Sequence, residues 1–286
     1  ILGLKDWSLN PDGSYQPFTT PRNAARMGTL GNVRTVNGKQ KPVYDIPAGG
    51  AVRVRLLNMD NTRVFTISLK NQATEATVLS SDGMPLPEPH KLEGYAIGAG
   101  MRIDLGLIAP KPGEEVVIYD RKGRFHFEIC RLRSVASDNP QRLSLPQLPP
   151  NPIPLADLDN ARRLKFVFEW EGALSPTDAK GKTKHVFWTI NRRSWEGAGP
   201  DKIPEPLAVL KLGESYLMDL HNSTPHQHPI HLHGEIFQVL ASNKKTITPY
   251  LADTVLVGKD ETVTIALKTT NPGKWMFHCH VIEHMK

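Results

Sequence analysis

The chain has 286 residues, of which 39% are hydrophobic and 22% charged, with a formal net charge of +6 at pH 7. This length allows two domains of ordinary size, and the composition is that of soluble globular proteins. No run of about eighteen apolar residues occurs, so no membrane-spanning helix is expected. The basic residues are scattered and not interleaved with aromatic residues, which argues against nucleic-acid binding.

The predicted elements are short β-strands separated by turns. Alternating hydrophobic residues predict strands at residues 52–56, 103–107 and 164–168. Turn-forming residues cluster at 10–13, 47–50, 111–113 and 258–260. This pattern predicts an all-β fold made of Greek-key β-sandwich domains.

A proline-rich stretch divides the chain. Five prolines fall within residues 143–154, which is typical of a stiff linker. We therefore predict a first domain at residues 1–142, a Pro-rich linker at 143–160 and a second domain at 161–286.

The two halves repeat each other weakly. The matched pairs are residues 35–37 with 189–191, 55–58 with 219–222, and 112–113 with 272–273. Extending the last pair places residues 118–120 opposite 278–280, so the first copy lacks the histidines of the second. A structural motif would occur in both copies, which indicates that those histidines have another role.

Eight of the eleven histidines lie between His221 and His284, mostly in two short stretches. Residues 228–234 read HPIHLHG, and residues 275–284 read WMFHCHVIEH. Side chains on a strand alternate between its faces, so Cys279 points away from both of its histidine neighbours. Two such strands side by side would offer one set of donors from His228, Cys279 and His284, and an opposite set from His231, His233, His278 and His280.

The donor types favour copper. A thiolate with two imidazoles is the donor set of a blue-copper electron-transfer site, and a single cysteine argues against structural zinc. Four imidazoles on the opposite face fit a cluster of several coppers, although a zinc or iron site using His231 and His233 stays open. Because Cys279 is bonded through the backbone to His278 and His280, the two sites would share a covalent electron route.

These motifs resemble the C-terminal signature of multicopper oxidases, such as laccases, bilirubin oxidases and bacterial cuproxidases. The family reduces dioxygen to water with electrons taken one at a time from a reducing substrate. The resemblance implies two cupredoxin domains, the first without metal. It implies a catalytic blue copper held by His228, Cys279 and His284, a lone cluster copper held by His231, and a coupled copper pair held by His233, His278 and His280.

The chain departs from the family pattern in three ways. The family draws four further cluster histidines from two His-x-His pairs in an N-terminal domain, and no such pair precedes residues 226–228. We therefore expect the middle and last domains of a three-domain enzyme, with the trinuclear cluster completed by an N-terminal domain or another chain. The expected axial ligand would lie beyond Lys286, and Met285 replaces an acidic residue found in many bacterial members. Residues 1–7 carry no signal peptide, so a processed chain or fragment is expected.

The expected partners are dioxygen and a small reducing substrate, either a phenol, a pigment or a metal ion, with no nucleic acid and no membrane. A homo-oligomer stays open. Family resemblance places the protein in the periplasm or outside the cell. The alternative function is a blue-copper electron-transfer or copper-binding protein that does not reduce oxygen.

Other polar residues have simpler expected roles. Cys130 is expected to be a buried hydrophobic residue without a disulfide to Cys279, and Asp253 is a candidate to accept a hydrogen bond from an imidazole. Glu283 is not expected to bind metal, and Trp275 is expected to pack ahead of the ligand strand. Roles outside the metal sites are expected for His90, His126, His185, His221 and His226.

Overall fold

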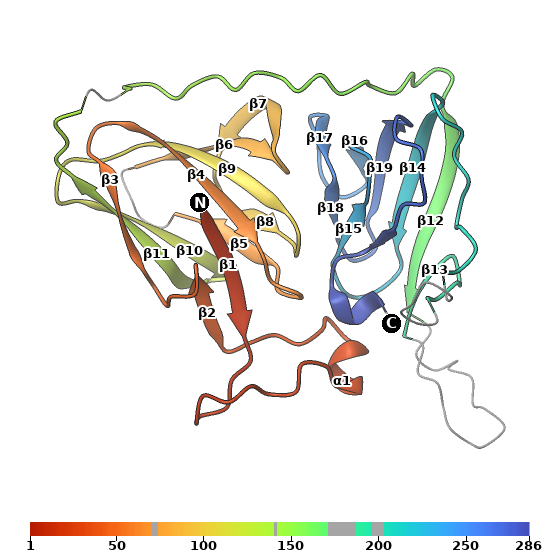
Figure 1. Ribbon diagram of the computed structural model, residues 1–286, viewed down its shortest axis with the longest axis horizontal. Helices are drawn as coiled ribbons and strands as arrows, with labels where there is room; N and C mark the ends of the chain where they lie inside the picture. The colour runs from red at the N-terminus through yellow and green to blue at the C-terminus, as the bar shows by residue number, and fades with distance from the viewer. Residues whose placement is uncertain (70–73, 140–141, 171–186, 196–202, 286) are drawn as a thin grey trace. The chain divides into compact units, whose positions relative to one another are not determined.

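The computed structural model describes residues 1–69, 74–139, 142–170, 187–195 and 203–285. The chain divides into two compact units, of which the first contains Ile1–Gln16 and Leu30–Asn151 and the second Pro17–Thr29 and Pro152–Lys286 (Figure 1). The division after Asn151 falls inside the predicted linker. The predicted first domain, residues 1–142, did not anticipate that Pro17–Thr29 belongs to the second unit, because the hydrogen bonds that hold it there are long-range.

The first unit is a β-sandwich of two sheets, with strand orders β2-β1-β4-β9-β6-β7 and β3-β11-β10-β5-β8. Neighbouring strands are antiparallel except for the parallel pairs β1–β4 and β3–β11. The strands are β1 (Leu2–Trp7), β2 (Val33–Val36), β3 (Val43–Pro47), β4 (Ala51–Asn58), β5 (Phe65–Ser68), β6 (Ala76–Ser81), β7 (Met84–Lys91), β8 (Tyr95–Ile97), β9 (Arg102–Ile108), β10 (Glu115–Lys122) and β11 (Phe125–Val135).

The second unit repeats this architecture, with sheet orders β13-β12-β14-β19-β16-β17 and β18-β15-β20. The smaller sheet is antiparallel throughout and carries most of the predicted ligands. The strands are β12 (Arg162–Trp170), β13 (Trp188–Ile190), β14 (Ser215–Asn222), β15 (His228–Leu232), β16 (Phe237–Ser242), β17 (Tyr250–Ala252), β18 (Thr254–Val257), β19 (Thr262–Lys268) and β20 (Phe277–Cys279).

These strands confirm the predicted all-β fold. The predicted strands at 52–56, 103–107 and 164–168 lie within β4, β9 and β12. The helical elements of the described residues are α1 (Pro21–Ala24) and the 3-10 helix η2 (Ile282–Met285). Within the same residues, no helix combines the length and the hydrophobicity needed to cross a membrane.

The internal repeat is confirmed by matching buried asparagines at the ends of β4 and β14. The Asn58 side chain donates to the carbonyls of Arg63 and Ile97 and accepts from the Asp60 amide. Asn222 is fully buried, donates to three carbonyls and accepts from the Thr224 amide two residues later in the same way. Both copies therefore close the turn after this strand with one amide side chain.

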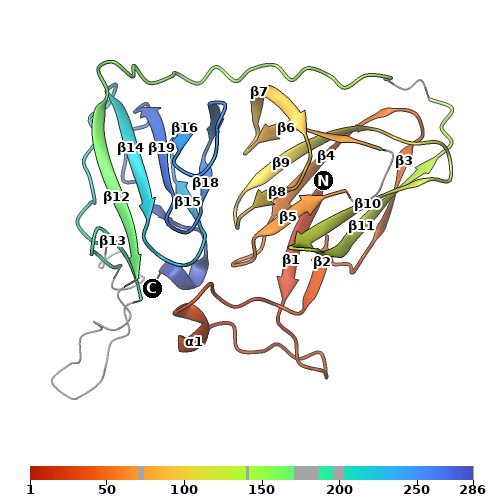
Figure 2. The same cartoon turned by 180° about the vertical axis from the view of Figure 1, so that it is seen from behind.

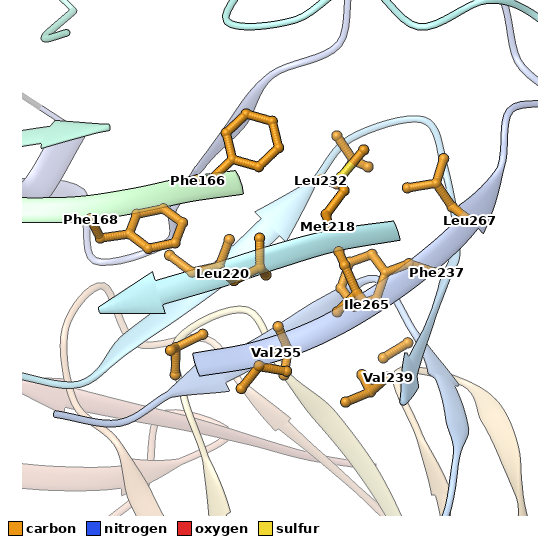
Figure 3. Packing of buried hydrophobic residues seen from close by; sticks show 14 of the residues in the cluster. Phe166, Phe168, Met218, Leu220, Leu232, Phe237, Val239, Val255, Ile265 and Leu267 are labelled. Carbon is orange, nitrogen blue, oxygen red and sulfur yellow. The ribbon is translucent and has the colours of Figure 1, made fainter. Parts of the chain in front are cut away.

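The core of the second unit lies between its two sheets. Alternate residues of β14 point into it, including Met218 and Leu220, and Figure 3 shows them beside Phe166 and Val255 from other strands. A fully buried leucine or valine contributes about 1.5–3 kcal/mol relative to an exposed one. Cys279 belongs to this buried cluster, so the core fixes the strand that carries the sulfur.

Residues 17–29 form one wall of the second unit. Thr20 is the N-cap of α1, its side chain accepts from the Asn23 amide at 3.2 Å, and Pro21 opens the helix. Gly28 has φ +90° and lets the chain turn back after the helix. Both views place α1 beside η2, near the end of the ligand-bearing region (Figure 2).

Candidate metal centre

Strand pairing sets the two faces of the site. β20 pairs with β15 so that Cys279 lies opposite Ile230 and His278 lies opposite His231. Directly opposed residues in an antiparallel pair point to the same side of the sheet. Cys279 therefore shares the core face with Ile230 and with His228, two positions before it, whereas His231 and His278 share the opposite face.

The sulfur and two imidazoles converge on the core face. The Cys279 Sγ lies 3.4 Å from His228 Nδ1 and 3.6 Å from His284 Nδ1, and the two Nδ1 atoms are 3.2 Å apart. His284 reaches this point because η2 turns the chain back after β20, with the His284 amide bonded to the Val281 carbonyl at 2.9 Å. The structure thus brings the predicted group together in a small buried volume.

Hydrogen bonds on the outer edges leave both Nδ1 atoms free for a metal. His284 Nε2 lies 2.7 Å from the Arg26 carbonyl, which can only accept, so Nε2 carries the proton. His228 Nε2 lies 2.8 Å from the Thr224 hydroxyl, which itself lies 3.4 Å from the His226 carbonyl to which it donates. Both rings therefore present an unprotonated Nδ1 toward Cys279.

Burial keeps the group uncharged. It lowers the pKa of His228 well below its ordinary value, with the nearby His284 adding to the effect, and it lowers the pKa of His284 to about 4. Burial also raises the pKa of the Cys279 thiol to about 12. A metal bound here must displace the thiol proton, and two neutral imidazoles and one thiolate suit a soft ion such as copper.

The other four predicted histidines gather on the opposite face. Their ring centroids are 4.6 Å apart for His231 and His233, 5.1 Å for His233 and His278, and 5.6 Å for His278 and His280. The Nε2 atoms of His233 and His278 lie 3.0 Å apart. Burial lowers the pKa of His278 to about 4 and also lowers the pKa values of His233 and His280.

Backbone carbonyls orient these rings. His231 Nδ1 lies 2.9 Å from the Asp253 carbonyl and 3.0 Å from the Thr254 hydroxyl. His278 Nδ1 lies 2.9 Å from the carbonyl of Cys279. In both rings the Nδ1 proton goes to a carbonyl, so Nε2 is free for a metal. Asp253 thus accepts from His231 through its backbone carbonyl and not through its side chain as predicted; the carboxylate Oδ1 lies 3.5 Å from His231 Nδ1 and accepts from the Thr254 hydroxyl at 2.7 Å.

The glycine and tryptophan of the motifs pack against each other. Gly234 has φ +75°, and a Cβ placed there would lie 2.3 Å from the Trp275 ring. The Trp275 indole donates to the Asn271 carbonyl at 2.8 Å. This contact ties the end of one ligand stretch to the start of the other, which confirms the packing role of Trp275.

Sequence reasoning missed Trp188. Its ring centroid lies 4.0 Å from that of His284 and 5.2 Å from that of His228, and it is only 6% exposed. A signal was present, because the internal repeat aligns Trp188 with Arg34, a change from a charged to an aromatic residue. With Phe168 and Phe277, Trp188 also lines a cavity of about 110 Å³ that reaches the Cys279 group.

The remaining expectations concern residues outside these two sets. Cys130 and Cys279 are both free and buried, so the disulfide is excluded. The buried Glu283 carboxylate accepts from the Thr29 amide at 2.7 Å and from its hydroxyl, and does not join the donor sets. His185 lies outside the described residues. The single histidines that the structure does describe have their own neighbours: His90 and His126 in the first unit, His221 beside Thr262, and His226 beside Trp188.

Comparison with known proteins agrees with this geometry. A family model described as multicopper oxidase matches residues 175–286. A laccase from Fomitopsis schrenkii is 44% identical, in a match that covers 100% of this chain and 61% of the laccase. The crystal structure of a multi-copper oxidase from Pseudomonas parafulva is 44% identical with a TM-score of 0.84, covering 100% of this chain and 66% of that one. A second such structure, from Pseudomonas thermotolerans, is 40% identical with a TM-score of 0.85, covering 99% and 64%.

The chain thus spans just under two thirds of the length of these relatives. Its two sandwich units correspond to part of each relative. The matches cover the residues that bring Cys279 and the histidines together. On this sequence and structural similarity, the chain belongs to the multicopper oxidase family.

Proposed function

We propose that this chain forms the blue-copper half of a laccase-like oxidase. In this proposal His228, Cys279 and His284 hold a mononuclear copper that accepts single electrons from a reducing substrate. His231, His233, His278 and His280 supply this chain's share of a trinuclear cluster that reduces dioxygen to water. The remaining cluster ligands would come from an N-terminal domain or another chain.

One observation carries the proposal: His278 and Cys279, neighbours on the three-residue strand β20, contribute to the two donor sets from opposite faces of the sheet. A structural metal site would need only one of them. Cys279 contributes its sulfur to one face, while its carbonyl accepts a hydrogen bond from His278 on the other. The sets are therefore joined both by a peptide bond and by a hydrogen bond, which supports electron transfer between them.

The protein's own residues have defined tasks in this function. Bound copper supplies one-electron redox chemistry at the sulfur site and dioxygen reduction at the cluster. The Arg26 and Asp253 carbonyls hold the protons of His284 and His231 away from their metal-facing nitrogens. The hydrophobic core packs around Cys279 and leaves its sulfur buried, which limits the exposure of a thiolate to oxidants.

The reducing substrate is the less constrained part of the proposal. The cavity lined by Phe168, Trp188 and Phe277 reaches the Cys279 group. Its aromatic lining favours an organic donor, such as a phenol or a pigment, over a hydrated metal ion. We also propose a periplasmic or extracellular location on the family resemblance, which fractionation of cells producing the native protein would test.

Two matched cysteine variants test the function. The native protein loaded with copper should show intense visible absorption and consume oxygen with a phenolic donor. Cys279→Ser should lose both, whereas Cys130→Ser, at the other buried free cysteine, should keep both. Colour and turnover in Cys279→Ser would remove this residue from the mechanism. Colour without oxygen uptake in the native protein would instead indicate an electron-transfer protein.

A further inference from the structure

Residues 17–29, here called the cap, cover the outer edge of His284. The cap precedes the rest of the second unit by more than 120 residues in the sequence, yet it belongs to that unit. Its helix α1 lies against η2, the element that carries His284. None of the predicted metal ligands lies in the cap, so the metal sites do not by themselves account for it.

Three contacts fix the cap around His284. The Trp188 indole donates to the Ala24 carbonyl at 2.6 Å, and the Arg26 carbonyl accepts from His284 Nε2 at 2.7 Å. The buried Glu283 carboxylate accepts from both the amide and the hydroxyl of Thr29. Two anchors thus flank the Arg26 carbonyl, one on each side, and hold it over the imidazole.

The central contact decides which nitrogen of His284 can bind copper. A free imidazole exchanges its proton between Nδ1 and Nε2, and a carbonyl acceptor at Nε2 fixes it there. The Nδ1 atom, 3.6 Å from Cys279 Sγ, then keeps its lone pair for a metal. The hydrogen bond from Nε2 to the Arg26 carbonyl also makes the imidazole a stronger electron donor to a metal, which favours oxidised over reduced copper.

We propose that the cap is a positioning and access element that fixes the copper-binding tautomer of His284 and prevents a reducing substrate from touching its Nε2 edge. The proposal rests on the proposed function for its second part only. Thr29, Glu283 and Trp188 are positioning residues: Thr29 and Glu283 act through the cap, and Trp188 acts through the cap and by packing against the His284 ring. A substrate would then reach the site by the cavity beside Trp188.

Two variants weaken the anchors without replacing a proposed ligand; Thr29→Val acts on the cap alone, whereas Trp188→Phe also alters a ring that packs against His284. Thr29→Val removes the hydroxyl that bonds Glu283, and Trp188→Phe removes the indole proton that bonds Ala24. Thr262→Val is the control for the first, because Thr262 lies 2.9 Å from His221 in the same unit. Trp170→Phe, at a half-exposed tryptophan, is the control for the second.

The first measurement needs no copper. In ¹⁵N-labelled, copper-free protein, the His284 resonances should report the Nε2–H tautomer in the native sequence and both control variants. They should report a mixture in Thr29→Val and Trp188→Phe, with faster amide hydrogen exchange confined to residues 17–29. Faster exchange of the cap with an unchanged His284 tautomer would overturn the proposal, as would a native sequence in which Nδ1 carries the proton.

The second measurement uses the copper-loaded native protein. Both anchor variants should raise the reduction potential of the mononuclear copper, and should increase kcat/KM severalfold more for a bulky phenol than for ferrocyanide. Equal changes for both donors would contradict the access role, and a potential that stays at the native value would contradict the positioning role. A native protein that binds no copper would defeat the proposed function, while the tautomer result would still decide the role of the cap at His284.

Discussion

Replacing Gly234 by alanine should destabilise the second unit far more than the same change at Gly213. Both glycines have positive φ, +75° and +81°, which costs alanine about 1–2 kcal/mol at either position. Only at Gly234 does the new Cβ meet a side chain, since the Trp275 ring lies 2.3 Å from it, whereas nothing lies within 4 Å at Gly213. Overpacking of this kind costs about 1–3 kcal/mol more.

Urea unfolding monitored by circular dichroism would measure this difference. We expect Gly234→Ala to lose about 2–5 kcal/mol and Gly213→Ala about 1–2 kcal/mol. Trp275→Leu should recover part of the loss in the Gly234→Ala background, as a double-mutant cycle would show. Because Gly234 follows His233 directly, the copper content of the Gly234→Ala protein should also fall. Equal destabilisation by the two glycine variants would refute the packing role assigned to Trp275.

Two further predictions concern stability and metal content. Chelator-treated protein should lose stability as the pH falls from about 6.5 toward 4. In this range the histidines of the unfolded state bind protons, whereas His278 and His284 in the folded state, with pKa values of about 4, do not. Thermal unfolding at several pH values measures how steeply stability falls with pH. The fall should be shallower in His284→Gln, and an unchanged fall in that variant would exclude His284 as a contributor. Asn222→Ala and Asn58→Ala should each lower the free energy of unfolding by about 3 kcal/mol, because each leaves buried carbonyls without a hydrogen-bond donor. Only Asn222→Ala should reduce the copper content, measured by atomic absorption. Equal copper loss in both asparagine variants would contradict this.

The sequence was sufficient for the parts of the site that depend on local geometry. The alternation of side chains on a strand placed Cys279 on one face and His278 on the other, and the register of β15 and β20 agrees. The repeat aligned residues 55–58 with 219–222, and the structure shows the same buried amide closing the turn at Asn58 and at Asn222. Such features follow from residues close in sequence.

Long-range contacts to backbone atoms could not be predicted in this way. The bond between His284 and the Arg26 carbonyl joins positions 258 residues apart and depends on no particular side chain at Arg26. Residues 17–29 precede the proline-rich stretch, so the boundary predicted from that stretch placed them in the first domain. Trp188 could have been found from the sequence, because the repeat aligns it with Arg34 and the two copies differ in residue type at this position.

The second unit is built from two separate segments of the chain, and this constrains how it can be produced. A recombinant fragment starting at residue 152 would contain every predicted copper ligand in this chain but would lack the carbonyl that meets His284 Nε2. During synthesis on a ribosome, residues 17–29 emerge first and cannot take up their final contacts until Glu283 has followed. In a nascent chain the contacts of residues 17–29 with Glu283 and His284 are therefore among the last that can form.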